Sequence, residues 1–141
     1  MSETPTRESL LEANAAFYHA FEALDMKAMA ALWEESDRVF CVHPGWQALH
    51  GREAVISSWR NIMINTGRIR FTLTNLRAHI DGLVGTVTLY ENIQSIAGGQ
   101  RHTASTIATN LFSFDEEQGL WLLFHHHASL AAVPESSEIV N

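Results

Sequence analysis

The chain has 141 residues, 46% of them hydrophobic, and its formal net charge is −7. This length provides one domain whose core needs no metal or disulfide to support it, and the excess of acidic residues argues against nucleic acid as a partner. No apolar run approaches the ~20 residues of a membrane helix, so we expect no contact with a membrane. Cys41 is the single cysteine and the N-terminus lacks a signal-peptide pattern, so we expect a cytoplasmic location.

The first half of the chain has the periodicity of helices. Thr4 followed by Pro5 predicts a helix start, with Thr4 as the cap, and apolar residues then recur every three or four positions. Asp25 interrupts this pattern and predicts the cap of a second helix, with almost no loop before it. A third helix is predicted to begin at Gly51 and to stop at Asn65.

Strand-like patterns fill the rest of the chain. The apolar run 39–42 ends at the turn-forming residues 44–45, which is typical of a short strand. Four longer strand-like runs follow the third helix. Turns are predicted between them at residues 81–82, 98–99 and 115–119. Helices first and consecutive hairpins afterwards predict the α+β class, in a single domain over residues 1–133 with a flexible tail over residues 134–141.

Four short motifs accompany this order of elements. They are Val42-His43-Pro44-Gly45-Trp46, Glu91-Asn92-Ile93, Ala108-Thr109-Asn110 and His125-His126-His127-Ala128-Ser129. With them the chain resembles the nuclear transport factor 2-like (NTF2-like) superfamily, in its SnoaL-like and ketosteroid isomerase-like branch. The resemblance implies a cone-shaped, cystatin-like fold, in which a curved antiparallel sheet packs on three N-terminal helices around an apolar pocket. It also implies a homodimer through the outer face of the sheet. Because this fold hosts isomerases, dehydratases, cyclases and non-catalytic binders, it predicts where to look and not what happens there.

His43 holds the first candidate position within this resemblance. In ketosteroid isomerase the short strand ends in an Asp-Pro pair whose aspartate moves the proton, and the corresponding pair here is His43-Pro44. A neutral imidazole accepts a proton at neutral pH without the tuning that a carboxylate needs. The sequence therefore predicts His43 as a base, and the structural alternative is a histidine bonded to a backbone carbonyl beside a turn.

Asn110 falls where the isomerase carries its protonated aspartic acid, the donor to the developing enolate. An amide keeps the donor and does not titrate, although a strand-end amide bonded to a neighbouring loop is an equal alternative. The isomerase's tyrosine corresponds to Phe17, and Tyr18 lies one residue, or about 100°, further around the helix. The resemblance therefore implies an incomplete enolate site, which argues against steroid isomerisation.

Alternation along the strands predicts which other polar residues face the pocket. If Leu123 faces inward, His125 and His127 do so too, whereas His126 faces outward. The same alternation turns Glu91 inward, and a bulge would reverse these assignments. A carboxylate among apolar neighbours attracts a protonated partner, so we expect a pair between Glu91 and His127 or His125.

Two uses of such a pair stay open. In the first, Glu91 orients a histidine that moves protons alongside His43. In the second, His43, His125 or His127 and Glu91 hold a divalent metal in a two-histidine, one-carboxylate set. No His-Glu-x-x-His spacing supports the second use, and the chain has no Gly-rich phosphate loop or Cys-x-x-Cys pair. We therefore expect neither a metal nor a cofactor.

Aromatic and apolar residues complete the candidates. Trp33 and Trp59 have the spacing of helical core residues, and Cys41 is expected to act as a small buried hydrophobe. Trp46 follows a Pro-Gly turn beside His43, where its ring would form either a lid or a wall of the pocket. The predicted ligand-binding residues are Phe17, Tyr18, Trp46, Val87, Leu89, Phe112, Leu123 and His125. The predicted outward set, expected at a subunit interface, is Thr88, Tyr90, Asn92, Phe124 and His126.

The sequence hypothesis is a homodimeric SnoaL-like protein whose pocket takes a small, mostly apolar molecule bearing a carbonyl or a hydroxyl. A catalytic version would isomerise, dehydrate or cyclise it. The predicted catalytic residues are His43 as base, Asn110 as donor, and Glu91 with His127 as relay. The alternative is a non-catalytic ligand-binding or dimerisation module, which needs the same pocket but no proton chemistry.

Overall fold

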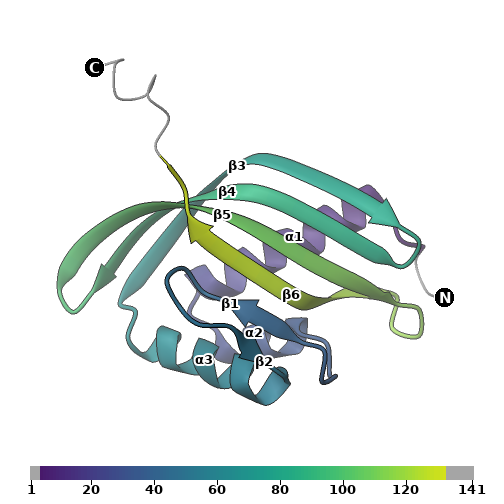
Figure 1. Ribbon diagram of the computed structural model, residues 1–141, viewed down its shortest axis with the longest axis horizontal. Coiled ribbons are helices and arrows are strands. Elements are labelled where there is room, and N and C mark those ends of the chain that lie inside the picture. The colour runs from purple at the N-terminus through teal and green to yellow at the C-terminus, as the bar shows by residue number, and fades with distance from the viewer. Residues whose placement is uncertain (1–3, 133–141) are drawn as a thin grey trace.

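The computed structural model describes residues 4–132, and the predicted tail at residues 134–141 lies outside them. Its elements are α1 (Arg7–Glu22), α2 (Met26–Leu32), β1 (Phe40–Val42), β2 (Leu49–His50), α3 (Arg52–Ile64), β3 (Arg68–Asp81), β4 (Val84–Ala97), β5 (Gln100–Asp115) and β6 (Leu120–Leu130). The strands form one sheet in the order β2-β1-β6-β5-β4-β3 (Figure 1). The predicted α+β class with three helices and a four-strand meander is confirmed, and the short strand β2 is an addition.

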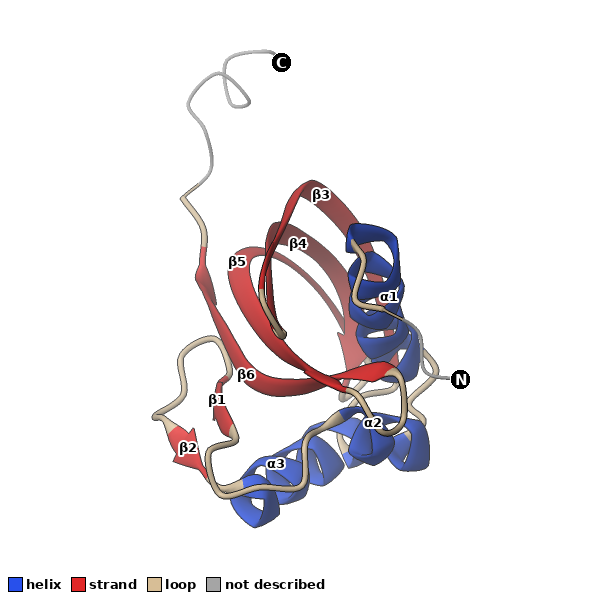
Figure 2. Ribbon diagram, turned by 90° about the vertical axis from the view of Figure 1, so that its right-hand side faces the viewer, coloured by secondary structure: helices blue, strands red, loops and turns tan. Residues whose placement is uncertain are grey.

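The sheet curves strongly around one side of α1, and α2 and α3 lie below α1 in the view of Figure 2. Neighbouring strands of the meander are antiparallel, while β1 runs parallel to β6. Among residues 4–132 no helix is long and apolar enough to cross a membrane.

The first helix begins two residues later than the sequence predicts. Thr6 is its cap: the Thr6 hydroxyl accepts a hydrogen bond from the Ser9 N–H, and the Ser9 hydroxyl accepts one from the Thr6 N–H. Such a reciprocal pair needs a side chain that accepts a hydrogen bond three residues after the cap. Thr6 has Ser9 there, whereas Thr4 has Arg7, which only donates. The predicted cap of α2 is confirmed, because the Asp25 carboxylate accepts from the Ala28 N–H.

A bulge at Phe124 changes the facing of the last strand. Leu123 pairs with Phe112 and His125 pairs with Leu111, which leaves Phe124 without a partner on β5. The bulge lies where β6 exchanges neighbours, since Trp33 bridges to Leu123 and Phe40 of β1 pairs with His125. One extra residue shifts the alternation that follows it.

The prediction that His125 and His127 face inward and His126 outward is therefore wrong. His126 is buried, His125 is half-buried and His127 is exposed. Thr88, Tyr90 and Asn92 of the predicted outward set alternate along β4 with inward-facing residues and lie on the outer face of the sheet. Phe124, the residue at the bulge, is half-buried and packs under the Arg38 guanidinium at 3.9 Å.

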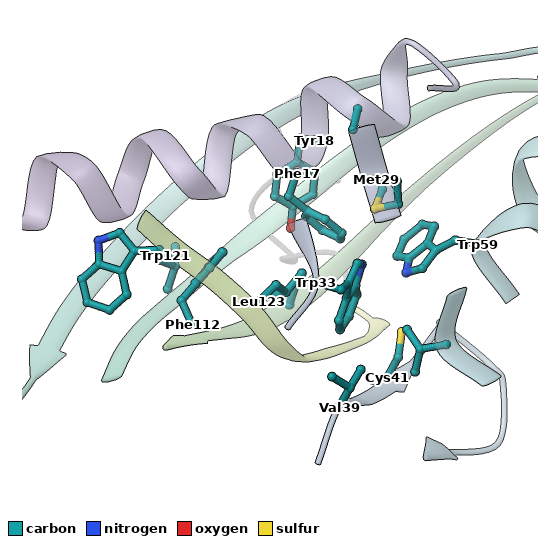
Figure 3. Packing of buried hydrophobic residues seen from close by; sticks show 14 of the residues in the cluster. Phe17, Tyr18, Met29, Trp33, Val39, Cys41, Trp59, Phe112, Trp121 and Leu123 are labelled. Atoms are coloured by element: carbon teal, nitrogen blue, oxygen red, sulfur yellow. The ribbon is translucent and has the colours of Figure 1, made fainter. Parts of the chain in front are cut away.

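The core lies between α1 and the concave face of the sheet. The rings of Phe17, Trp33 and Trp59 meet there edge to face (Figure 3), and both tryptophans are buried as expected. Cys41 is buried too, and burial raises the pKa of its thiol. Gly85 of β4 lets the sheet approach α1 closely, because a Cβ on it would lie 2.7 Å from Cδ1 of Leu10.

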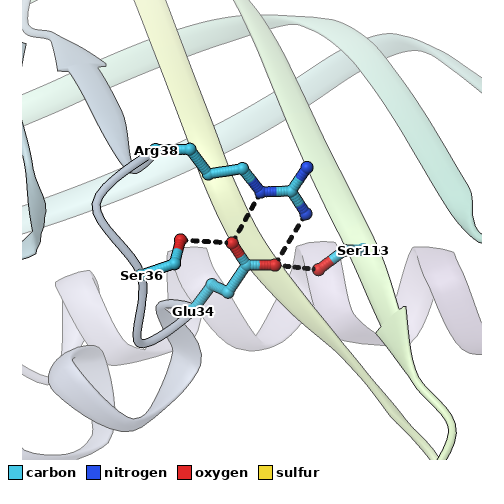
Figure 4. A network of polar contacts seen from close by, with 4 residues as sticks. All are labelled: Glu34, Ser36, Arg38 and Ser113. Carbon is cyan, nitrogen blue, oxygen red and sulfur yellow. Dashed lines mark hydrogen bonds and ion pairs between the residues drawn. The ribbon is translucent and has the colours of Figure 1, made fainter.

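Glu34 fastens the segment between α2 and β1 to the sheet (Figure 4). Its carboxylate accepts hydrogen bonds from Arg38 Nε and Nη2, both at 2.7 Å, and from the hydroxyls of Ser36 and Ser113. The bonds from Arg38 above all lower the pKa of Glu34 to about 2. This network holds β1 against the meander and so positions the residues that follow it.

Candidate functional site

A cavity of about 250 Å³ opens between the concave face of the sheet, α1 and α3. It is lined by Phe17, Phe21, His43, Pro44, Trp46, Trp59, Ile62, Ile69, Phe71, Glu91, Ile93 and His126. Its wall is therefore mainly apolar and aromatic, with one carboxylate and two imidazoles. Small-molecule sites have this composition, and the volume lies just below their ~300–1,000 Å³ range.

Glu91 is the buried acid of this wall. Its side chain is 3% exposed, and it accepts hydrogen bonds of 2.5 Å from the hydroxyls of Tyr18 and Thr106. Bonds this short are typical of hydroxyl groups that donate to an ionised carboxylate. Burial raises the pKa of Glu91, and the two hydroxyl donors oppose that rise. The predicted pair with His125 or His127 is wrong, because hydroxyl groups hold Glu91 instead.

Asn110 connects Glu91 to His126. Its amide nitrogen donates to Oδ1 of Asn14 at 2.9 Å and to the hydroxyl of Tyr18 at 3.1 Å. Its carbonyl oxygen lies 2.6 Å from Nδ1 of His126, so this Nδ1 carries a hydrogen and donates. Both amide hydrogens are used inside the protein, and the side chain is fully buried. The structure thus corrects the predicted donor role: Asn110 joins an internal network and does not line the cavity.

His126 occupies the inward position that strand alternation predicts for His125 and His127. Its ring lines the cavity beside Phe17, with 5.0 Å between the ring centres. Burial, and then the nearby His125 and His127, lower the pKa of His126 to about 3, so the ring is neutral at pH 7. Since Nδ1 carries the hydrogen, Nε2 has a free lone pair, and it has no hydrogen-bond partner within residues 4–132.

His43 lies at the end of β1 and is 4% exposed. Its Nε2 is 2.9 Å from the hydroxyl of Ser58, whose own hydrogen is donated to the Val55 carbonyl at 2.6 Å. Nε2 must therefore carry the hydrogen of the neutral ring. Burial above all lowers the pKa of His43 to about 3. The ring lines the cavity, and its role as a base stays a prediction.

Two tryptophans flank His43. The ring of Trp59 lies 4.7 Å from the imidazole and that of Trp46 lies 4.8 Å away, both edge to face. Trp46 is 45% exposed and also lines the cavity. Of the two predicted options for Trp46, the structure shows a wall residue at the rim.

Other candidate residues lie elsewhere. His125 stacks on Phe40 at 4.9 Å, away from the cavity, and His127 is exposed. Tyr18 is buried behind Glu91. The predicted ligand-binding residues found in the packed core and not in the cavity wall are Val87, Leu89, Phe112 and Leu123. Within the described part of the chain, no group of three or more His, Cys, Asp or Glu side chains is arranged to hold a metal ion.

The sequence alone does not identify several polar partners of the site. Asn14 interrupts the apolar stripe of the first helix, and that polar residue on a buried face was a usable signal. Thr106 shares the inward alternation of Asn110 on β5 and could have been found in the same way. Ser58 and His126 gave no signal, because their placement depends on helix packing and on the bulge.

Comparison with known proteins agrees with the geometry. Residues 10–134 match the family model of the SnoaL-like domain. A structure from Streptomyces avermitilis, described as a "putative dehydratase from the NTF2-like family", is 38% identical over 90% of this chain and 96% of that chain, with a TM-score of 0.83. The chain therefore belongs to the SnoaL-like family of the NTF2-like superfamily.

Two further matches extend this relationship. A Thiobacillus denitrificans structure, described as a "putative calcium/calmodulin-dependent protein kinase type II association domain", is 30% identical over 94% of this chain and all of that chain, with a TM-score of 0.76. The F-box protein SKIP8 of Arabidopsis thaliana is 26% identical over 136 residues, which is 96% of this chain and 55% of that protein. This chain spans about half the length of that relative.

Proposed function

We propose that the cavity binds a small apolar organic molecule and that Glu91 is the general base of a proton transfer on it, in an isomerase, dehydratase or cyclase reaction. The observation that carries this proposal is a buried carboxylate in the wall of an otherwise apolar cavity. A carboxylate removed from water is costly, and perturbed acids in clefts are candidates for proton chemistry. The similarity to a structure described as a "putative dehydratase" supports the same reaction classes.

Glu91 is a better base than either imidazole in the cavity. A catalytic base works best when its pKa lies near the working pH. Burial moves the pKa of Glu91 upward, toward neutrality, but lowers the pKa of both His43 and His126 to about 3. We therefore propose Glu91 as the general base, in place of His43, which the sequence predicts.

Proton uptake by Glu91 also relieves the cost of burying its charge. The hydroxyls of Tyr18 and Thr106 hold the two carboxylate oxygens in fixed positions, so the lone pairs that remain have a defined direction. The apolar wall excludes water, which strengthens the interaction of the carboxylate with a ligand proton. In this arrangement Tyr18, Thr106 and Asn110 position the base and do not meet the ligand.

The alternative function is non-catalytic ligand binding. It is favoured by one observation: the N–H and O–H groups around Glu91 are used in bonds within the protein, which leaves them unable to stabilise a developing oxyanion. A measured pKa separates the two functions. A general base requires Glu91 to titrate, by carbon-13 NMR of its carboxyl group, above the ordinary glutamate value of ~4.3; a value at or below that favours a binding module.

Blocking the cavity tests ligand binding itself. Ile93 lines the cavity, and Ile64 is an exposed residue of α3 outside it. With 2-indanol, a small bicyclic alcohol, as the probe, we expect saturable binding to the wild-type chain and to Ile64→Trp. Binding to Ile93→Trp should be at least tenfold weaker, because the indole fills the cavity. Absence of saturable binding to the wild-type chain, or equal binding to Ile93→Trp, would overturn the proposal.

We also propose a homodimer through the outer face of the sheet. Tyr90 and Ile107 pair across β4 and β5 on that face, and Ile107 is exposed. Sedimentation should show a dimer that Ile107→Glu dissociates and that Ile64→Glu leaves intact. A wild-type monomer at micromolar concentration would contradict this proposal.

A further inference from the structure

The polar side chains around Glu91 donate their hydrogens to other groups of the protein. The Tyr18 and Thr106 hydroxyls donate to Glu91. The two amide hydrogens of Asn110 go to Asn14 and Tyr18. A hydroxyl has one hydrogen and a primary amide has two, so these three side chains have no hydrogen left for a ligand.

The two imidazoles follow the same rule. His126 donates its ring hydrogen from Nδ1 to Asn110, and His43 donates its own from Nε2 to Ser58. Each neutral ring therefore keeps a bare nitrogen, which is Nε2 in His126 and Nδ1 in His43. The thiol of Cys41 lies 3.9 Å from Nδ1 of His43, which is a weak contact. Nε2 of His126 is consequently the more available acceptor.

The tryptophan N–H groups add no donor at the buried end of the cavity. Nε1 of Trp59 is buried beneath neighbouring atoms and has no partner within residues 4–132, so a ligand in the cavity does not reach it. Trp46 lines the cavity at its exposed rim, where its indole N–H is open to water. Apart from the Trp46 N–H at the rim, the polar atoms that remain for a ligand inside the cavity are acceptors: the second lone pairs of the Glu91 oxygens, Nε2 of His126 and, in contact with the Cys41 thiol, Nδ1 of His43.

We infer that the cavity selects small apolar molecules that carry a hydrogen-bond donor, namely alcohols and phenols, over ketones and ethers with the same skeleton. The inference rests on the proposed function. The sequence allows a ligand that bears either a carbonyl or a hydroxyl, and the cavity favours the hydroxyl. A hydroxyl hydrogen meets a carboxylate lone pair, and hydrogen bonds to charged groups are among the stronger ones. A carbonyl oxygen would face lone pairs only, and it would lose its water without finding a donor.

Four indane compounds test this selection. Indane, 2-indanol, 2-methoxyindane and 2-indanone share one skeleton, and the dissociation constant of each for the full chain at pH 7 can be measured by NMR titration. We expect 2-indanol to bind about tenfold more tightly than the ether and the ketone, which is what one hydrogen bond to a charged acceptor contributes. In Glu91→Gln, whose amide also offers donor hydrogens, this preference should fall to about threefold or less.

Each outcome has one meaning. Equal affinities for the alcohol, ether and ketone, or tighter binding of 2-indanone, would overturn the inference while leaving ligand binding intact. No binding of any of the four compounds would overturn the proposed function, and the inference with it. If Glu91→Gln does not fold, the order of affinities in the wild-type chain still decides, because it needs no variant.

Discussion

Tyr18→Phe removes one hydroxyl from the centre of the buried network. That oxygen donates to Oε2 of Glu91 at 2.5 Å and accepts from Asn110 at 3.1 Å. The ring itself packs against Phe17 and Phe71, so the variant keeps its packing and opens almost no space. The substitution therefore isolates the polar role of Tyr18.

The expected loss of stability depends on pH. Losing a hydrogen bond to a charged group costs about 1.5–3 kcal/mol, and a buried N–H left without its acceptor costs about 1–3 kcal/mol. The two terms share one network and do not add fully, so we expect a loss of about 3 kcal/mol at pH 8. At pH 4 Glu91 is mostly protonated in the fold, so the lost bond is one between neutral groups, and the expected loss falls to about 1–2 kcal/mol.

The direction in which this loss of stability changes with pH follows from the raised pKa of Glu91. An acid whose pKa is higher in the fold than in the unfolded chain destabilises the fold above that pKa, and stability returns as pH falls through it. Losing the Tyr18 donor raises this pKa further, because the hydrogen bond from Tyr18 favours the ionised carboxylate. The wild-type chain and the variant should therefore differ most above the pKa of the variant.

Urea denaturation at pH 8 and pH 4 measures both values. Ser57→Ala is the matched control, because it removes one exposed hydroxyl from α3, and surface changes away from such networks stay within about 0.5 kcal/mol. An equal loss for Tyr18→Phe at both pH values, or a loss no larger than that of Ser57→Ala, would refute the reasoning.

Two further predictions concern the supports of the fold. Glu34→Gln should reduce the free energy of unfolding at pH 7, because the pKa of Glu34 is about 2 in the fold against 4.5 ordinarily; in urea titrations the wild-type advantage should fade as pH falls from 4.5 to 2, and a loss independent of pH would contradict this. Gly85→Ala should cost about 1–3 kcal/mol through overpacking, because the new Cβ meets Leu10 in the core. Leu10→Ala should recover part of that cost in the double variant, and an unchanged unfolding midpoint for Gly85→Ala alone would show that the contact is not tight.

The sequence predicts the fold well because its signals are local. Asp25 caps α2 through its own side chain. The turn at residues 98–99 lies where the pattern places it, and the turn predicted at residues 81–82 lies one residue later, at 82–83. The wrong cap at Thr4 also has a local cause. Ser9 forms a capping box with Thr6, and the Thr4-Pro5 pattern does not indicate it. Periodicity and turn chemistry thus account for the order of the elements.

The site was harder to predict because it depends on contacts between distant segments. The bulge at Phe124 arises where β6 changes neighbours from Trp33 to β1, and nothing in the run of three histidines shows it. Because of this single extra residue, His126 faces the cavity and His127 is exposed. Likewise, the donor hydrogens of Asn110 can be assigned only once Asn14 and Tyr18 are known to lie beside it.

The ring tautomers of His126 and His43 test the central claim most directly. Long-range nitrogen-15 NMR of the imidazole rings at pH 7 identifies the nitrogen that carries the hydrogen. The hydrogen-bond network requires neutral rings with opposite tautomers, Nδ1–H in His126 and Nε2–H in His43. An Nε2–H tautomer in His126 would mean that the chain through Asn110 and Tyr18 runs in the reverse direction, and that the cavity offers a ligand a donor where this account gives it an acceptor.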